Sequence, residues 1–114
     1  MEIAVSSQGG ATVVRISGNL DGNTVNVAQE KIMPLVGAKG AGVVLDLKDC
    51  GYISSAGLRL LLMAAKQVAA QDGALVLSGV SPEVRDVMEM TGFNNFFRMF
   101  DAVPAAVAAV KKGA

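Results

Sequence analysis

Histidine is absent from this sequence of 114 residues, and cysteine occurs once, at Cys50. Without histidine there is no Ser-His or Cys-His nucleophile pair and no imidazole, the commonest protein ligand for a metal. A single cysteine forms neither an internal disulfide nor a thiolate metal cage. We therefore expect no catalytic residues, no metal site and no cofactor.

Aromatic residues are scarce as well, with no tryptophan, one tyrosine and four phenylalanines, so stacking on nucleic-acid bases is poorly supplied. Ten Lys and Arg residues balance ten Asp and Glu residues, and no net charge draws the chain to nucleic acid or to an anionic membrane. The longest apolar runs, 60–65 and 102–110, are too short to span a bilayer. The first residues lack the features of a signal peptide. We expect a cytoplasmic protein that binds neither nucleic acid nor a membrane.

Apolar residues are abundant, at 52% of the chain. A chain of this length removes roughly two-thirds of its unfolded surface from water, which is enough for one core. We therefore expect a single domain over residues 1–114. Lys111 and Lys112 are interpreted as the solvated end of a helix and not as a nucleic-acid patch.

Hydrophobic spacing predicts strands alternating with helices over most of the chain. The expected strands are 2–6, 11–17, 43–47, 74–78 and 95–100, and the expected helices begin near residues 25, 55, 82 and 102. The first two strands flank Gly9-Gly10 and form a hairpin. Ser81-Pro82 starts the third helix, and Gly92 ends it. The order β-β-α-β-α-β-α-β-α predicts an α/β fold with parallel strand pairs.

The segment 46–59 carries the most information about function. Ser54 is expected to cap the long helix and Ser55 to lie in its first turn. The simplest interpretation is that both serines serve only the helix start. Two features favour a further role: Tyr52 and Ile53 are apolar residues expected at a loop tip, where a partner would bury them, and Gly57 in a first helical turn costs about 1 kcal/mol relative to Ala.

Arg59 lies one turn beyond Ser55, near the positive end of the helix dipole, where a cation is unfavourable. A phosphate on Ser55 would meet free amides, the helix dipole and this guanidinium, which together form a favourable anion site. The same phosphate would bring a charge of about −2 to an apolar-rimmed surface and oppose any partner that docks there. The segment therefore predicts a phosphorylation switch.

At these residues the chain resembles the STAS family, in particular the bacterial anti-sigma factor antagonists. The similarity runs over essentially the whole length and is most specific in Tyr52-Ile53-Ser54-Ser55-Ala56-Gly57-Leu58. It includes Gly18-Asn19-Leu20-Asp21 and Ser81-Pro82-Glu83-Val84. The resemblance implies a mixed central sheet of about five strands, with about four helices packed mainly on one side.

The resemblance also implies a function in partner switching. An unphosphorylated antagonist binds an anti-sigma factor that is a serine kinase, and so frees a sigma factor. The kinase phosphorylates the antagonist, which ends binding, and a PP2C-type phosphatase reverses the modification. The phosphorylated serine falls on Ser55, with Ser54, which stands where many members have Asp, as the alternative.

The surface expected to contact the partner combines the resemblance with the helical spacing. Arg59, Met63 and Lys66 follow one exposed stripe, which is equally well interpreted as a solvated face. Asp21 matches the acidic residue of the family's early loop and is expected close to the phosphorylated serine. The candidate partner-binding residues are Asp21, Tyr52, Ile53, Ser54, Ser55, Gly57, Leu58, Arg59 and Met63.

Two other functions stay open. The chain could be a STAS scaffold that is not phosphorylated, or an accessory subunit of a transporter, with Ser54 and Ser55 only capping the helix. A hydrolase or phosphotransferase that uses Asp21 and Asp46 with a metal is the least favoured, because the only available bases are carboxylates and lysines. Asp46 is more simply interpreted as a strand-end residue that binds loop amides.

Overall fold

The structure is a computed structural model that describes residues 1–113, with side chains for residues 1–110; the interpretation of Lys111 and Lys112 lies outside the described side chains. One sheet has the strand order β1-β2-β3-β4-β5. Its strands are β1 (Glu2–Gln8), β2 (Ala11–Ser17), β3 (Gly42–Asp46), β4 (Ala74–Ser78) and β5 (Met99–Phe100). The helices are α1 (Val25–Val36), α2 (Ser55–Ala70), α3 (Pro82–Thr91) and α4 (Val103–Gly113), with a short 3₁₀ helix, η1, at Phe93–Phe96.

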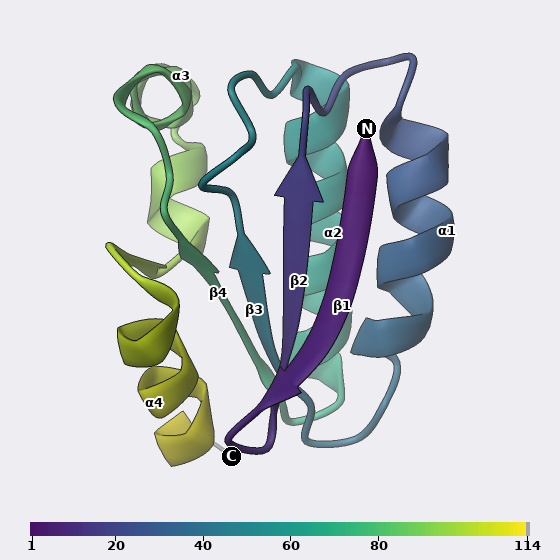
Figure 1. The fold of residues 1–114 in the computed structure, drawn as a ribbon, viewed down its shortest axis with the longest axis vertical. Helices are drawn as coiled ribbons and strands as arrows, with labels where there is room; N and C mark the ends of the chain where they lie inside the picture. The colour runs from purple at the N-terminus through teal and green to yellow at the C-terminus, as the bar shows by residue number, and fades with distance from the viewer. Residues whose placement is uncertain (114) are drawn as a thin grey trace.

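The sheet is mixed, as expected. β1 pairs antiparallel with β2, and each later pair is parallel. A right-handed crossover is the usual way to join parallel neighbours, and a helix lies in every connection from β2 to β5 (Figure 1). The predicted fold of five strands and four helices is confirmed.

Alternate residues of the central strands face two separate cores, because successive side chains of a strand point to opposite faces. Val14 and Leu45 pack in the larger core with buried residues of α1, α2 and α3. Val13 and Val44 pack in the smaller one under Ala106 of α4. Three helices thus cover one face and α4 covers the other (Figure 1).

The residues predicted to start and end α3 do so in the structure. The Ser81 hydroxyl accepts a hydrogen bond from the amide of Val84 at 3.2 Å, and Pro82 is the first helical residue. Gly92 ends the helix with a φ of +78°, a left-handed conformation that glycine adopts without a steric penalty.

The predicted strand 95–100 is wrong over most of its length. Residues Phe93–Phe96 form η1, and only Met99 and Phe100 join the sheet. The aromatic residues favour a strand by propensity. Tertiary packing overrides that preference, because a helical turn after Gly92 brings the Phe93 and Phe96 rings edge to face at 6.2 Å and lets Phe97 enter the core.

Parallel strands end at the same edge of a sheet, so the loops that follow β2, β3 and β4 gather at one end of the molecule (Figure 1). The loop 47–54, which carries the predicted switch, lies there beside the loop 18–24. No helix in the described part of the chain is long and apolar enough to cross a membrane.

Candidate functional site

The loops after β2 and β3 are joined by backbone hydrogen bonds. The amide of Leu20 donates to the carbonyl of Tyr52 and the amide of Ser54 donates to the carbonyl of Leu20, each at 2.9 Å. Leu20 and Ile53 thereby form an isolated parallel bridge. The pairing of β2 with β3 is in effect resumed beyond the strand ends, and it fixes the start of α2 against the loop that carries Asp21.

The two serines at the start of α2 have different environments. The hydroxyl of Ser54 is partly buried and accepts a hydrogen bond from the amide of Gly57 at 3.3 Å, which makes Ser54 the N-cap, as predicted. Ser55 is the first helical residue and is exposed. Its hydroxyl has no hydrogen-bond partner among the described side chains and backbone. Ser55 is therefore the serine that an enzyme can reach without disturbing the cap.

Gly57 has a steric role that the sequence did not reveal. A Cβ at this position would lie 2.7 Å from the carbonyl oxygen of Leu20 and 2.9 Å from a methyl group of Ile53. These separations are far below van der Waals contact, so a side chain would push α2 away from the Leu20 loop. The close packing of α2 against the Leu20 loop therefore gives a structural reason for glycine at this position.

Exposure of the predicted contact residues is mixed. Tyr52 is 50% exposed, as expected. Ile53 is 1% exposed, so the expectation that a partner buries its side chain is wrong. Leu58, a predicted contact residue, is 0% exposed, and its side chain is not available to a partner. Both already pack in the core, and the bridge to Leu20 turns Ile53 inward. The sequence pattern placed Ile53 at an open loop tip because the pairing of the two loops is not visible in it.

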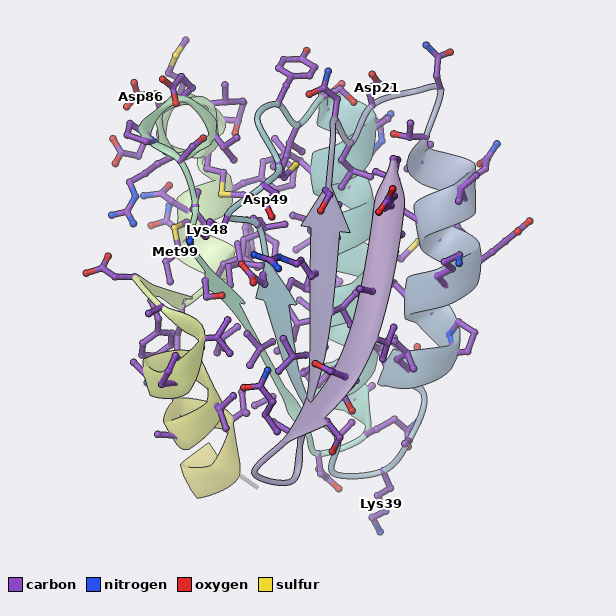
Figure 2. All side chains as sticks on the ribbon, viewed as in Figure 1. Asp21, Lys39, Lys48, Asp49, Asp86 and Met99 are labelled. Atoms are coloured by element: carbon purple, nitrogen blue, oxygen red, sulfur yellow. The ribbon has the colours of Figure 1, made fainter. Side chains whose placement is uncertain are left out.

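Asp21 organises its own loop. Its carboxylate accepts hydrogen bonds from the amide of Asn23 at 2.9 Å and from the hydroxyl of Thr24 at 3.4 Å, and its amide donates to Thr24 at 3.0 Å. Such local bonds are typical of Asp and Thr at turns. Asp21 is half-buried and follows Leu20, which is bonded to Ser54, so the acidic residue lies on the same edge as the two serines (Figure 2).

Arg59 and Met63 line a groove between α1 and α2. Arg59 is exposed and Met63 is 43% exposed, which confirms the predicted exposure of this part of the stripe. The groove has a volume of about 300 Å³ and takes Val25 and Gln29 from α1. The groove exists only once α1 and α2 pack, so no local pattern in the sequence indicates that Val25 and Gln29 line it.

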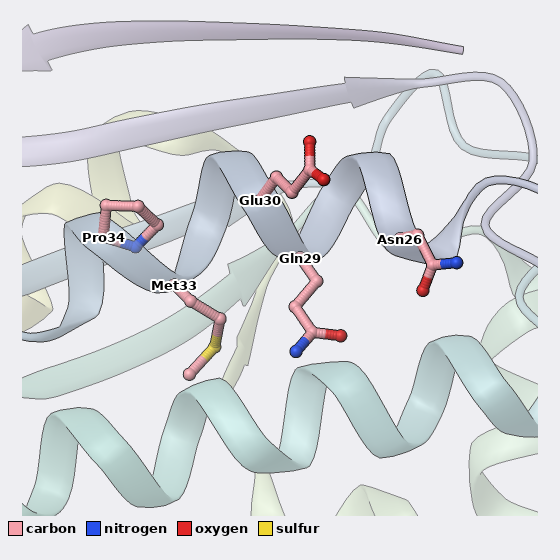
Figure 3. A pocket seen from close by; sticks show the side chains of 5 residues that line it. All are labelled: Asn26, Gln29, Glu30, Met33 and Pro34. Atoms are coloured by element: carbon pink, nitrogen blue, oxygen red, sulfur yellow. The ribbon is translucent and has the colours of Figure 1, made fainter.

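A second, shallower hollow of about 710 Å³ runs along α1 itself. It is lined by Asn26, Gln29, Glu30, Met33 and Pro34, and Gln29 also lines the first groove. Gln29 and Met33 point toward α2, while Glu30 points away from it (Figure 3). The two hollows make the α1 side of the site uneven and partly apolar.

Two further residues of the segment have structural roles. Cys50 is buried, and burial raises the pKa of its thiol. Asp46 accepts a hydrogen bond from the amide of Lys48 at 3.1 Å and lies 3.7 Å from Nε of Arg15, which confirms the interpretation that it binds loop amides. Arg15 also pairs with Asp49 at 3.1 Å.

The fold and the site define an α/β protein with an exposed serine hydroxyl at a helix start, between Tyr52 and Arg59 in the sequence, on an edge made of two joined loops. The STAS domain family matches residues 2–106. The chain belongs to that family.

Its relatives include anti-sigma factor antagonists from several bacteria. The proposed anti-sigma factor antagonist BtrV of Bordetella bronchiseptica is 34% identical over 111 residues, covering 97% of this chain and 96% of that protein. The anti-sigma-B factor antagonist of Bacillus subtilis is 33% identical over 82 residues, covering 72% of this chain and 74% of that protein.

Solved structures share the fold at low sequence identity. A STAS domain protein of Planctomyces limnophilus superposes with a TM-score of 0.88 at 21% identity, covering 96% of this chain and 97% of that one. The Bacillus cell-fate determinant SpoIIAA in its phosphorylated form gives a TM-score of 0.71 at 21% identity, covering 96% of this chain and 99% of that one. These likenesses support the fold alone.

Proposed function

We propose that this chain is a cytoplasmic anti-sigma factor antagonist whose binding to an anti-sigma factor serine kinase is gated by phosphorylation of Ser55. The observation that carries the proposal is the exposed Ser55 hydroxyl at the first position of the 16-residue helix α2. The similarity to anti-sigma factor antagonists over nearly the whole chain supplies the class of partner.

In the proposed cycle the kinase transfers the γ-phosphoryl group of ATP to Oγ of Ser55, whose proton is lost, and ADP leaves. A PP2C-type phosphatase returns the hydroxyl by hydrolysis and releases inorganic phosphate. This chain contributes the acceptor and the docking surface and performs neither transfer itself.

The phosphate would be well accommodated where it forms. The amides of Ser55 and Ala56 have no acceptor within the helix, and the helix dipole favours an anion at this end. Arg59, one turn further on, is exposed and has no carboxylate within salt-bridge distance among the described side chains. Phosphorylation therefore leaves the fold intact.

The same charge would end binding. Tyr52 and Met63 are exposed apolar side chains on either side of Ser55 along the chain, and an interface core excludes charged groups that lack a partner. A dianion between them must lose its hydration if the kinase remains docked. The docking surface in this proposal is Asp21, Tyr52, Ser55, Arg59 and Met63, widened by the α1 residues Val25 and Gln29.

Ser54 is the less favoured acceptor. Its oxygen caps α2 through the Gly57 amide and is partly buried. A kinase would have to break that hydrogen bond and open the first turn, whereas the Ser55 hydroxyl needs no rearrangement.

The test is to isolate the bound kinase from the native host with wild-type protein and then to measure its affinity for four proteins by calorimetry. Wild type, Ser55→Ala and Ser54→Ala should bind, while Ser55→Asp should bind at least about tenfold more weakly. Mass spectrometry after incubation with the kinase and ATP should find phosphate on wild type and on Ser54→Ala and not on Ser55→Ala. Equal affinity of Ser55→Ala and Ser55→Asp would remove the gating claim and favour the scaffold or transporter-subunit alternative.

A further inference from the structure

One polar row interrupts the apolar face that α4 covers. The strand register pairs Arg15 with Asp46 and Asp46 with Ser78. Two residues earlier on the same strands and the same face, valines pack under α4: Val13, Val44 and Val76. The row lies at the carboxyl ends of β2, β3 and β4, the edge at which open α/β sheets bind ligands.

A cavity of about 330 Å³ opens over this row. It lies between the strand ends, the side chain of Lys48 and the segment 101–103 where α4 begins. It is on the other face of the sheet from α1 and α2, so the groove described above is a separate feature. Its volume is at the lower end of the range for small-molecule pockets.

Ser78 is among the residues that line this cavity, and its hydroxyl has no hydrogen-bond partner. Ser78 is 0% exposed, and its Oγ is the one buried side-chain oxygen or nitrogen that lacks a hydrogen bond among the side chains that the structure describes. A buried hydroxyl left unpaired is destabilising. Its presence next to an open cavity indicates that an occupant supplies the missing bond.

The charges around the cavity define that occupant. The carboxylate of Asp46 is already engaged by the Lys48 amide and by Arg15. Four donors remain: the Ser78 hydroxyl, the Lys48 ammonium, the Arg15 guanidinium, whose ion pairs to Asp46 and Asp49 use only Nε, and the Val103 amide that begins α4. The dipole of this helix of 11 residues favours an anion at its start. Asp101 at the rim is exposed and screened by solvent.

We propose that this cavity binds a phosphate group, as inorganic phosphate or as a small phosphomonoester, through Ser78, Lys48 and the start of α4. The tetrahedral group offers several acceptor oxygens, which matches donors that converge from a strand, a loop and a helix. The inference concerns a site other than the proposed switch.

The test is an NMR titration of the full chain with inorganic phosphate, and in a second arm with glycerol 3-phosphate, at constant ionic strength. Saturable shifts are expected in the amides of Lys48, Ser78 and Val103. Ser78→Ala and Lys48→Gln should each weaken binding about tenfold or more. Lys39→Gln, which removes a lysine at the opposite end of the molecule (Figure 2), should bind as wild type does.

Thermal unfolding gives a second readout. Ser78→Ala should be at least as stable as wild type without phosphate, because it removes an unpaired hydroxyl, and should lose the phosphate-dependent rise in Tm. Chemical-shift changes that do not saturate with phosphate would overturn the proposal. An equal loss of phosphate affinity in Lys39→Gln and Lys48→Gln would overturn it as well. Ser55→Ala should bind phosphate normally, so failure here is distinguishable from failure of the proposed function.

Discussion

The carbonyl oxygen of Leu20 occupies the space that a Cβ on Gly57 would need. The separation would be 2.7 Å, with the Leu20 side chain only 2.9 Å away. The same carbonyl accepts the amide of Ser54, so one backbone group both fixes the residue before α2 and sets how closely its first turn approaches. The position of the Ser55 hydroxyl thus depends on the loop after β2.

Gly57→Ala is therefore expected to destabilise the protein even though alanine favours helices. The propensity gain is about 1 kcal/mol, whereas overpacking a buried site costs about 1–3 kcal/mol, so the balance is a loss. Urea denaturation would measure it. Gly22→Ala is the matched control, because nothing lies within 4 Å of a Cβ there. A variant as stable as wild type would show that α2 shifts without cost.

Replacing Ser54 and replacing Ser55 by alanine are expected to change the stability of the protein by different amounts. Ser54→Ala removes the cap on the Gly57 amide and should cost about 1 kcal/mol. Ser55→Ala removes an exposed hydroxyl without a described partner and should change stability by less than about 0.5 kcal/mol. Urea midpoints of the two variants give the comparison, and the reverse order would contradict the assignment of Ser54 as the cap.

The order of elements could be predicted because local signals and tertiary structure agree along most of the chain. Ser81, Pro82 and Gly92 act where local chemistry places them. The end of the sheet could not be predicted, because the aromatic residues after Gly92 satisfy either a strand or a helical turn. The helical turn forms because it lets Phe97 pack in the core.

The sequence predicts the serines at the start of the helix, but it does not predict which neighbouring residues are exposed. Ser54 and Ser55 sit at a helix start, which spacing alone indicates. The inward turn of Ile53 and the fit of Gly57 depend on Leu20, more than thirty residues earlier in the chain. No local pattern encodes a contact between two loops, which is why the sequence alone predicts partner contacts at Ile53 and Gly57.

Tyr52 and Met63 are expected to contribute to the affinity for the kinase and to contribute little to the stability of the fold. Both are exposed apolar side chains, in the loop before Ser55 and on α2 after it, and truncating an apolar anchor at an interface centre costs about 2 kcal/mol or more. Tyr52→Ala and Met63→Ala should therefore weaken kinase binding by about tenfold or more, with little change in Tm. Met90→Ala, at an exposed methionine of α3, is the control. Loss of binding in the control alone would place the interface elsewhere.

Arg59 is expected to stabilise the dianionic form of a phosphate on Ser55. A neighbouring cation lowers the pKa of the second phosphate ionisation, so Arg59→Gln should raise that pKa. A ³¹P NMR titration of the phosphorylated protein would measure the change. Arg85→Gln on α3 removes an equally exposed guanidinium from another helix. Identical titrations for the two variants would remove Arg59 from the anion site.

Cys50 makes stability depend on pH in the alkaline range. Burial raises the pKa of its thiol in the folded state, so above the unfolded value of about 8.5 the unfolded chain loses this proton before the folded one does. The folded state then binds more protons, and the free energy of unfolding falls as pH rises toward the folded pKa. The stabilising contribution is complete below about pH 8 and is lost above it. Urea unfolding of wild type and Cys50→Ala across this range isolates the effect, because other alkaline groups titrate equally in both. The stability advantage of wild type should shrink as pH rises, and an advantage that stays constant would mean that the thiol has the same pKa in the folded and the unfolded chain.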